Sequence, residues 1–365
     1  MPLHSFNLVR SRGTRCAWWV AAILTLTVLP ASALRDHSRD NAVLPPEILL
    51  EGGRSLAFER TIESEKDVQG KQGFWHKVLD IVAGEPTYHG LVQPYGVVVD
   101  SRGRIIVTDP GAKGIHIFDM ERNKYKFLSR VNRKERLLSP QCVAVDSSDR
   151  IYVTDSESGD IFVFEASGKF LRTIGSIKGG EGYFKRPTGI AVDPVTGNIF
   201  VSDTLRNKIF VLSESGEVLR TIGEMGAGPG QFYFPTELRI HSNELIVVDA
   251  MNFRVQRLGL DGTVKGTFGE PGDALGTIFR PKGVAVDSEG HIYLVEGIAG
   301  IVQVFDQQGE LLYYFGKRGV DLTEFQLPTG LFIDKHDRIF VVDSYNQRVQ
   351  VFHYQGLAKQ GAETK

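Results

Sequence analysis

One short pattern occurs six times in this chain of 365 residues and limits what the chain can fold into. The pattern is Pro-x-Gly, three mostly apolar residues and Asp, followed by a turn and a second apolar strand that also ends in Asp. Its clearest copies begin at Pro187 and Pro281. Repeated units of this size cannot bury their faces alone and must stack on their neighbours. The opening prolines are 46, 47, 48, 46 and 47 residues apart: Pro94, Pro140, Pro187, Pro235, Pro281 and Pro328.

Each unit is predicted to contain four strands. In the first unit we place them at about 95–100, 104–108, 115–119 and 125–130. Apolar and polar residues alternate only weakly there, as expected when both faces of a sheet are covered. Forty glycines, concentrated between the apolar runs, are typical of a chain with many tight turns. The sequence therefore predicts an all-β fold.

The two ends of the repeat array are predicted to meet. Residues 58–62 match 170–174 and 218–222, which are fourth strands of later units, whereas the last unit ends at 349–352 without a fourth strand of its own. We therefore predict that an N-terminal strand at about 55–62 completes the last unit. Such closure of the ring removes exposed strand edges.

One connection between units is longer than the others. From Ile62 to the next opening proline takes 32 residues, against 13 in four other connections. Apolar residues in the surplus fit a helical stripe, and Gly84 suits the position after a helix end. We predict a short helix at about 72–83, with 78–82 as the closing strand in the competing interpretation. The residues that we expect to contact a partner there are Phe74, Trp75 and Leu79.

The N-terminus has the form of an export signal. Residues 1–33 contain three arginines, a short apolar core and the small-residue site Ala31-Ser32-Ala33. We expect 34–54 to be a flexible lead-in and 356–365 a tail. Export to the periplasm or beyond follows, and an uncleaved signal would be the one means of membrane attachment. Without the signal, 39 basic and 44 acidic residues give a net charge of −5.

The repeated motifs resemble NHL repeats, the units of six-bladed β-propellers. The resemblance rests on Pro-x-Gly-(Val/Ile)-Ala-Val-Asp, Ile-(Tyr/Phe)-Val-x-Asp and Asp-x-x-Asn-x-Arg, and it covers about residues 55–355. With the predicted signal, the chain is similar to exported bacterial NHL-repeat proteins. The family includes RNA-binding modules, protein-interaction platforms and a peptide-amidating lyase. The resemblance therefore implies a scaffold and leaves the activity open.

Candidate binding residues follow from the propeller architecture. Loops that join fourth to first strands and second to third strands lie on one face, around the mouth of the central channel. The residue after each opening proline should surround that mouth, either as a ligand-facing ring or as ordinary exposed turn residues. These residues are Tyr95, Gln141, Thr188, Thr236, Lys282 and Thr329.

Unit four departs most from the pattern. Glu237 and Arg239 replace the Gly and Ala of other units, on the same side of an inner strand. Buried charges need partners, so we expect the two to pair with each other or with Lys282, as a structural ion pair or as part of a site. Cys142, which replaces the same glycine in unit two, should be a small buried side chain.

The recurring aspartates at the ends of second strands are interpreted as structural. A carboxylate there can accept backbone N–H groups of the turn and meet the Arg of the Asn-x-Arg element. They are Asp109, Asp155, Asp203, Asp249 and Asp343, with Glu296 as an acidic substitute.

The sequence predicts no metal site, no cofactor and no nucleic-acid partner. The histidines fall at unrelated repeat positions, and only His241 lies in an inner strand, although the amidating lyase of the family uses converging histidines on zinc. Calcium-dependent lactonase propellers need several oxygen ligands around the channel, where Glu237 alone is suitable. The net charge is not basic, and two small basic loop patches do not form a phosphate-tracking groove.

The favoured hypothesis is a non-enzymatic exported scaffold that binds a protein, peptide or glycan on the mouth face. The alternative is a lyase or lactonase at the channel mouth. That enzyme would use Glu237, Arg239, Lys282 and Tyr95.

Overall fold

The computed structural model describes residues 45, 47–50, 54–68, 89–133, 135–175 and 183–355. The chain divides into two units, residues 1–43 and 44–365, and everything described belongs to the second. The predicted signal, the predicted helix at 72–83 and the C-terminal tail lie outside the described residues. Among the described residues, no helix is long and apolar enough to cross a membrane.

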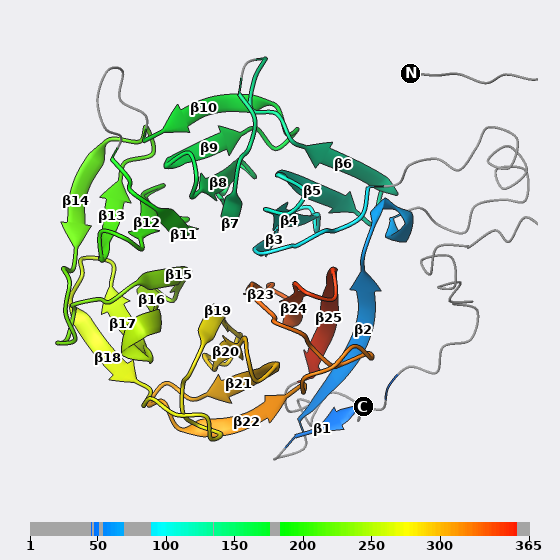
Figure 1. The fold of residues 1–365 in the computed structure, drawn as a ribbon, viewed down its shortest axis with the longest axis vertical. Coiled ribbons are helices and arrows are strands. Elements are labelled where there is room, and N and C mark those ends of the chain that lie inside the picture. Colours follow the sequence, from blue (N-terminus) through cyan, green and yellow to red (C-terminus); the bar gives the residue numbers. More distant parts are fainter. Residues whose placement is uncertain are drawn as a thin grey trace, which may run out of the picture. The chain divides into compact units, whose positions relative to one another are not determined.

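Six antiparallel sheets, the blades, surround a common centre (Figure 1). Each blade runs outward from an innermost first strand, and blades one to six follow the chain. The first strands are β3 (Val97–Val99), β7 (Pro140–Val145), β11 (Pro187–Val192), β15 (Pro235–His241), β19 (Pro281–Val286) and β23 (Leu331–Ile333). The second strands are β4 (Ile105–Asp109), β8 (Ile151–Asp155), β12 (Ile199–Asp203), β16 (Glu244–Asp249), β20 (Ile292–Glu296) and β24 (Arg338–Asp343).

The outer strands complete each blade. The third strands are β5 (Gly114–Asp119), β9 (Asp160–Phe164), β13 (Lys208–Leu212), β17 (Arg254–Gly259), β21 (Ile301–Phe305) and β25 (Arg348–Gln355). The fourth strands are β6 (Lys124–Leu128), β10 (Phe170–Ile174), β14 (Val218–Ile222), β18 (Val264–Phe268), β22 (Leu311–Phe315) and, from the N-terminal side, β2 (Ser55–Ile62). The six-bladed all-β fold is confirmed, with short 3-10 helices at Glu65–Asp67 and Ala250–Asn252 among the described elements.

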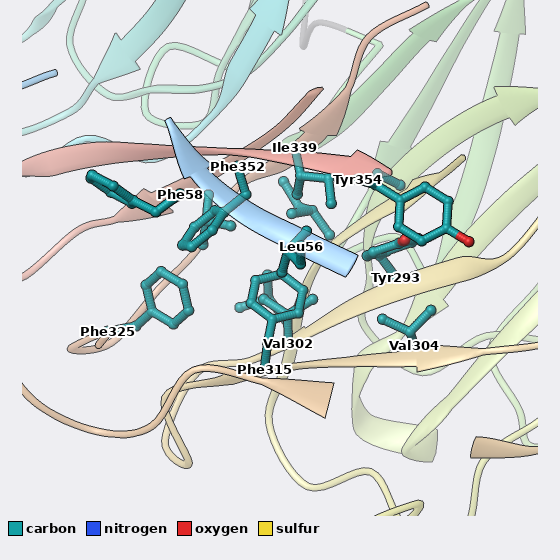
Figure 2. Packing of buried hydrophobic residues seen from close by; sticks show 14 residues of the cluster. Leu56, Phe58, Tyr293, Val302, Val304, Phe315, Phe325, Ile339, Phe352 and Tyr354 are labelled. Atoms are coloured by element: carbon teal, nitrogen blue, oxygen red, sulfur yellow. The ribbon is translucent and has the colours of Figure 1, made fainter. Parts of the chain in front are cut away.

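The N-terminal strand closes the ring as predicted. Sheet order in blade six is β1-β2-β25-β24-β23, where β1 covers Ile48–Leu49, and β2 pairs with β25 from Ser55↔Gln355 to Ile62↔Val349. Figure 2 shows Leu56 and Phe58 of β2 among apolar side chains of blades five and six. Leu56 is fully buried, and the Phe58 ring meets Phe352 edge-on at 5.7 Å. Closure is therefore fixed by both backbone pairing and an apolar core.

The Pro-x-Gly glycines let neighbouring first strands approach each other closely. A Cβ at Gly96 would lie 2.8 Å from the carbonyl oxygen of Gln141 in the next blade, and one at Gly283 would lie 2.5 Å from the backbone nitrogen of Leu331. Real Cβ atoms do not tolerate such contacts. The repeated glycine is therefore a requirement of the ring's narrow centre.

Hydroxyl groups join the first three blades at this centre. Thr108, Thr154 and Ser202, one residue before the second-strand aspartate, each donate to a first-strand carbonyl of the following blade. Each of these hydroxyl oxygens also accepts the backbone N–H of the residue at the Gly position of its own blade. Blades four to six have valine there, so their contacts at the centre need other groups.

We predict that the ring depends on β2 for cooperative folding. Deleting residues 1–62 should expose the edge of β25 and remove the apolar contacts of Leu56, giving a protein that aggregates or loses its sharp thermal transition. Deleting residues 1–44 should leave both the transition and the monomer elution volume unchanged. Equal behaviour of the two truncations in size-exclusion chromatography and calorimetry would contradict this account.

Candidate functional site

Buried carboxylates at the ends of the second strands tie the loops of one face together. Asp203 accepts the backbone N–H groups of Lys185 and Arg186 at 2.6 and 3.1 Å, from the loop that enters blade three. Asp343 accepts Gln326 N–H at 2.6 Å in the same way. The predicted structural role is confirmed, because equivalent bonds are made by Asp109, Asp155, Asp249 and Glu296.

The Arg of the Asn-x-Arg element also reaches its predicted carboxylate. Arg254 Nε lies 2.8 Å from Asp249 Oδ2, and Arg348 Nε lies 2.7 Å from Asp343 Oδ2. Charge-assisted bonds of this kind are stronger than neutral ones. We call the surface that carries these fourth-to-first and second-to-third loops the loop face.

Glu237 of β15 points across the centre of the ring. Its Oε1 lies 2.7 Å from Arg239 Nη1, which confirms the predicted pairing, and its Oε2 accepts the Cys142 thiol at 3.1 Å. Cys142 is on β7, so this contact passes β11 and joins blades two and four. Glu237 and Cys142 are 3% and 1% exposed. The cysteine is therefore free and buried, as predicted, but it is also a hydrogen-bond donor to a carboxylate.

Arg239 extends the same network to blade six. Its Nη2 donates to the Leu331 carbonyl at 2.8 Å, and its guanidinium lies 5.8 Å from the centre of the Phe332 ring. Lys282, the alternative partner of Glu237, forms no hydrogen bond or ion pair with the described residues. The charged pair of blade four thus links blades, at two positions where the other five have Gly or Cys and Ala, Val or Phe.

The Cys142 thiol and the Tyr95 phenol near the centre are held in their protonated forms. Burial, and then the Glu237 carboxylate, raises the pKa of the Cys142 thiol well above its usual value. Burial also raises the pKa of Tyr95, followed by the nearby Cys142 and Glu237, against a smaller lowering by Arg186. A protonated thiol and phenol are poor nucleophiles at neutral pH.

Most of the other predicted mouth residues serve the scaffold. Thr188 is buried and bonded to the Thr204 hydroxyl at 2.7 Å, so the expectation that it faces a ligand is wrong. Thr329 donates across blades to the Tyr95 carbonyl at 2.9 Å, and Gln141 donates to Ser139 at 3.0 Å. The polar groups of these three side chains therefore bond other residues of the protein.

Thr236 and Lys282 differ from these three. The Thr236 hydroxyl is buried and lacks a hydrogen-bond partner among the described residues, whereas the Lys282 side chain is exposed. Desolvation, with Arg280 nearby, lowers the pKa of Lys282. Phe74, Trp75 and Leu79 lie outside the described residues. Within the described ranges no three His, Cys, Asp or Glu side chains are grouped so that they could hold a metal.

Sequence reasoning missed a set of exposed apolar side chains on the loop face. Four of them occupy the same position, two residues after the terminal acid of the second strand, in blades three to six. The repeated aspartate marks this position, so alignment of the six copies would have revealed it. Their exposed fractions are 38% for Leu205, 38% for Met251, 47% for Ile298 and 65% for Tyr345.

Comparisons with known families agree with the architecture. Residues 127–199 and 191–268 match a family described as a 6-bladed beta-propeller, and residues 325–352 match the NHL repeat. No curated protein matches the chain at a significant level.

Solved structures with the same fold include proteins of different activities. A virginiamycin B lyase from Staphylococcus aureus is 16% identical (TM-score 0.53; 72% of this chain and 95% of that one). A gluconolactonase from Xanthomonas campestris is 14% identical (TM-score 0.56; 86% and 99%). An auxiliary nutrient binding protein from Bacteroides thetaiotaomicron is 13% identical (TM-score 0.56; 73% and 70%). At these identities the likeness shows the fold alone.

We predict that the charged pair of blade four behaves as one unit. Arg239→Ala should lower the free energy of unfolding by about 3–5 kcal/mol, because it leaves the buried Glu237 carboxylate without its cation. The double variant Glu237→Gly, Arg239→Ala has the same residue types as Gly283 and Ala285 of blade five. It should recover much of the unfolding free energy that the single variant loses. Denaturant unfolding of both single variants and the double variant measures the coupling. If the double variant lost the sum of the two single-variant losses in unfolding free energy, the two side chains would not be coupled and the prediction would be wrong.

Glu296 generates a prediction about pH. Burial raises its pKa from 4.5 to about 6, against a lowering by the Arg280 and Phe279 N–H groups. The folded protein therefore binds the proton more tightly, so this contribution to stability is complete below pH 4.5 and is lost as pH rises to about 6. Relative to Glu296→Gln, the wild type should lose about 2 kcal/mol between pH 4 and pH 7. Denaturant unfolding of both proteins at pH 4 and pH 7 measures this change. If the difference in unfolding free energy between wild type and variant were the same at both pH values, the prediction would be contradicted.

Proposed function

Because the chain is an NHL-repeat β-propeller with six blades, we propose that it is a non-enzymatic scaffold that binds a protein, peptide or glycan on its loop face. The proposal includes action in the periplasm or outside the cell, which rests on the export signal predicted for residues 1–33.

The observation that carries this proposal is the row of exposed apolar side chains on consecutive blades. Leu205, Met251, Ile298 and Tyr345 follow one another around the loop face. In blades three, four and six the second-strand aspartate also bonds the loop that carries the exposed residue, through Arg206 N–H, Asn252 Nδ2 and Asn346 Nδ2. Phe279 and Leu327, at 42% and 48% exposure, add to the same face. Exposed apolar side chains gathered on one face mark interaction sites more often than singly scattered residues do.

The chemistry of the ring centre favours binding over catalysis by the groups that were candidates for it. Glu237 and Arg239 are committed to each other and to Cys142 and Leu331. Tyr95 and Cys142 have raised pKa values, so neither is poised to exchange a proton near neutral pH. The lyase and lactonase structures share the fold with this chain, and fold alone does not transfer activity.

The test uses peptide and glycan arrays probed with the labelled full-length chain. Met251→Ser with Ile298→Ser should reduce array signals about tenfold or more, because the partner loses its apolar contact. A matched control changes two exposed apolar residues away from the loop face, Val195→Ser with Leu219→Ser, and should bind as the wild type does. Both variants should unfold at unchanged temperature. Signals that are absent, or equal in all three proteins, would contradict a binding role for this face.

A further inference from the structure

Three cations on the loop face have no counter-ion among the described residues. Arg186 and Arg280 immediately precede the opening prolines of blades three and five, and Lys282 follows the latter. All three are exposed, and none of their side chains forms a hydrogen bond or ion pair with the described residues. The Arg280 guanidinium lies 5.6 Å from the centre of the Phe279 ring. Their charge is therefore available to a partner.

Backbone hydrogen bonds place these cations beside the exposed apolar residues. Thr204 N–H donates to the Arg186 carbonyl at 3.0 Å, so Leu205 follows directly after a residue bonded to Arg186. Gly297 N–H donates to the Arg280 carbonyl at 3.0 Å in blade five, and Ile298 follows Gly297. A Cβ at Gly297 would come within 3.2 Å of Lys282 Cγ, so the lysine stem lies against this loop.

Positive charge gathers toward the centre of the face. Arg186 acts electrostatically on Tyr95 of blade one, and Arg280 lowers the pKa of Lys282. The acid at the centre, Glu237, is already paired with Arg239. The long outer loops of blades four to six instead carry exposed acids. These are Glu224, Glu270, Asp273 and Asp321.

This distribution of charge selects among partners. An anionic bilayer would meet the outer loops of blades four and five, whose exposed Glu224, Glu270 and Asp273 disfavour flat contact with a membrane. A small anion would need an enclosed pocket. Arg186, Arg280 and Lys282 line neither of two hollows in the described part, one of about 560 Å³ along the loop 223–231 of the same face and one of about 90 Å³ at turns of the opposite face. Aliphatic side chains such as Leu205 and Ile298 suit a polypeptide better than a sugar, which stacks on aromatic rings.

Resting on the proposed function, we infer that the partner presents an acidic polypeptide segment with interspersed apolar residues. Its carboxylates pair with Arg186, Arg280 and Lys282, and its apolar side chains pack on Leu205, Met251, Ile298 and Tyr345. Guanidinium groups pair well with carboxylates, and the fixed loops reduce the entropy cost of ordering the segment.

The experiment selects ligands from a displayed library of random dodecapeptides on the full-length chain. Enriched peptides should be rich in Asp, Glu and large apolar residues. Synthetic copies should bind the triple variant Arg186→Gln, Arg280→Gln, Lys282→Gln about tenfold or more weakly, and binding should weaken with salt. A matched triple variant, Lys124→Gln, Lys265→Gln, Lys335→Gln, removes equal exposed charge away from the face and should bind normally.

The outcomes separate the inference from the function on which it rests. Enriched peptides without acids that still depend on Met251 and Ile298 would overturn the acidic partner and leave the scaffold proposal standing. Peptides that bind the Met251→Ser, Ile298→Ser variant as well as its control variant would count against both the inference and the scaffold proposal. So would a selection in which no peptide is enriched. Binding of the wild type, but not of the charge variant, to phosphatidylserine vesicles in preference to the peptides would assign the face to membranes and overturn the inference.

Discussion

Each blade depends on one buried carboxylate at the end of its second strand. In every blade that group accepts N–H groups from the entering loop, and in every blade except the fifth it also accepts a bond from the turn that follows the second strand. Asp203 bonds Lys185 and Arg186 on one side and Arg206 N–H at 3.1 Å on the other. A buried carboxylate is costly unless such donors surround it. Satisfying it therefore fixes both loops of the same face at once, and it determines which side chains that face presents.

At the centre of the ring, the contacts that join first strands differ from blade to blade. Blades one to three join their neighbours through a hydroxyl one residue before the carboxylate, and blades four to six have valine there. Gly283 N–H bonds the Thr329 carbonyl directly at 2.8 Å, so a backbone hydrogen bond joins blades five and six at the centre. Blade four instead inserts Glu237 and Arg239, whose contacts reach blades two and six. A charged pair thus adds contacts across the ring to the neighbour-to-neighbour contacts that blade four keeps.

Periodicity in the sequence predicted the features that every unit shares. Six prolines at near-constant spacing indicated six blades, the match of 58–62 to other fourth strands indicated the closure, and recurrence of the aspartates indicated their structural role. Periodicity does not report where a side chain points once strands converge. Thr188 and Lys282 hold the same repeat position, yet one is buried in a hydroxyl pair and the other is exposed. The Cys142–Glu237 contact joins blades that are not neighbours, which no repeat pattern encodes.

Most of the proposed binding surface, all but Leu205 and Arg186 of blade three, lies on the half of the ring where an additional side-chain amide ties the entering loops. In each of blades four to six, the side-chain amide of a third-strand glutamine both accepts and donates a hydrogen bond to the loop that enters the blade. Gln350 accepts Thr323 N–H at 2.8 Å and donates to the Glu324 carbonyl at 2.7 Å. Gln256 and Gln303 do the same.

The other three blades lack this amide. Blades two and three have Phe162 and Phe210 at the position, and blade one has His116, whose buried Nε2 has no hydrogen-bond partner among the described residues. A loop held by both a carboxylate and an amide loses little freedom when a partner binds. Met251, Ile298, Tyr345, Arg280 and Lys282 all belong to the blades with the amide. Most of the exposed apolar and basic side chains of the proposed surface therefore lie in blades four to six, where the entering loops are held by an amide as well as a carboxylate.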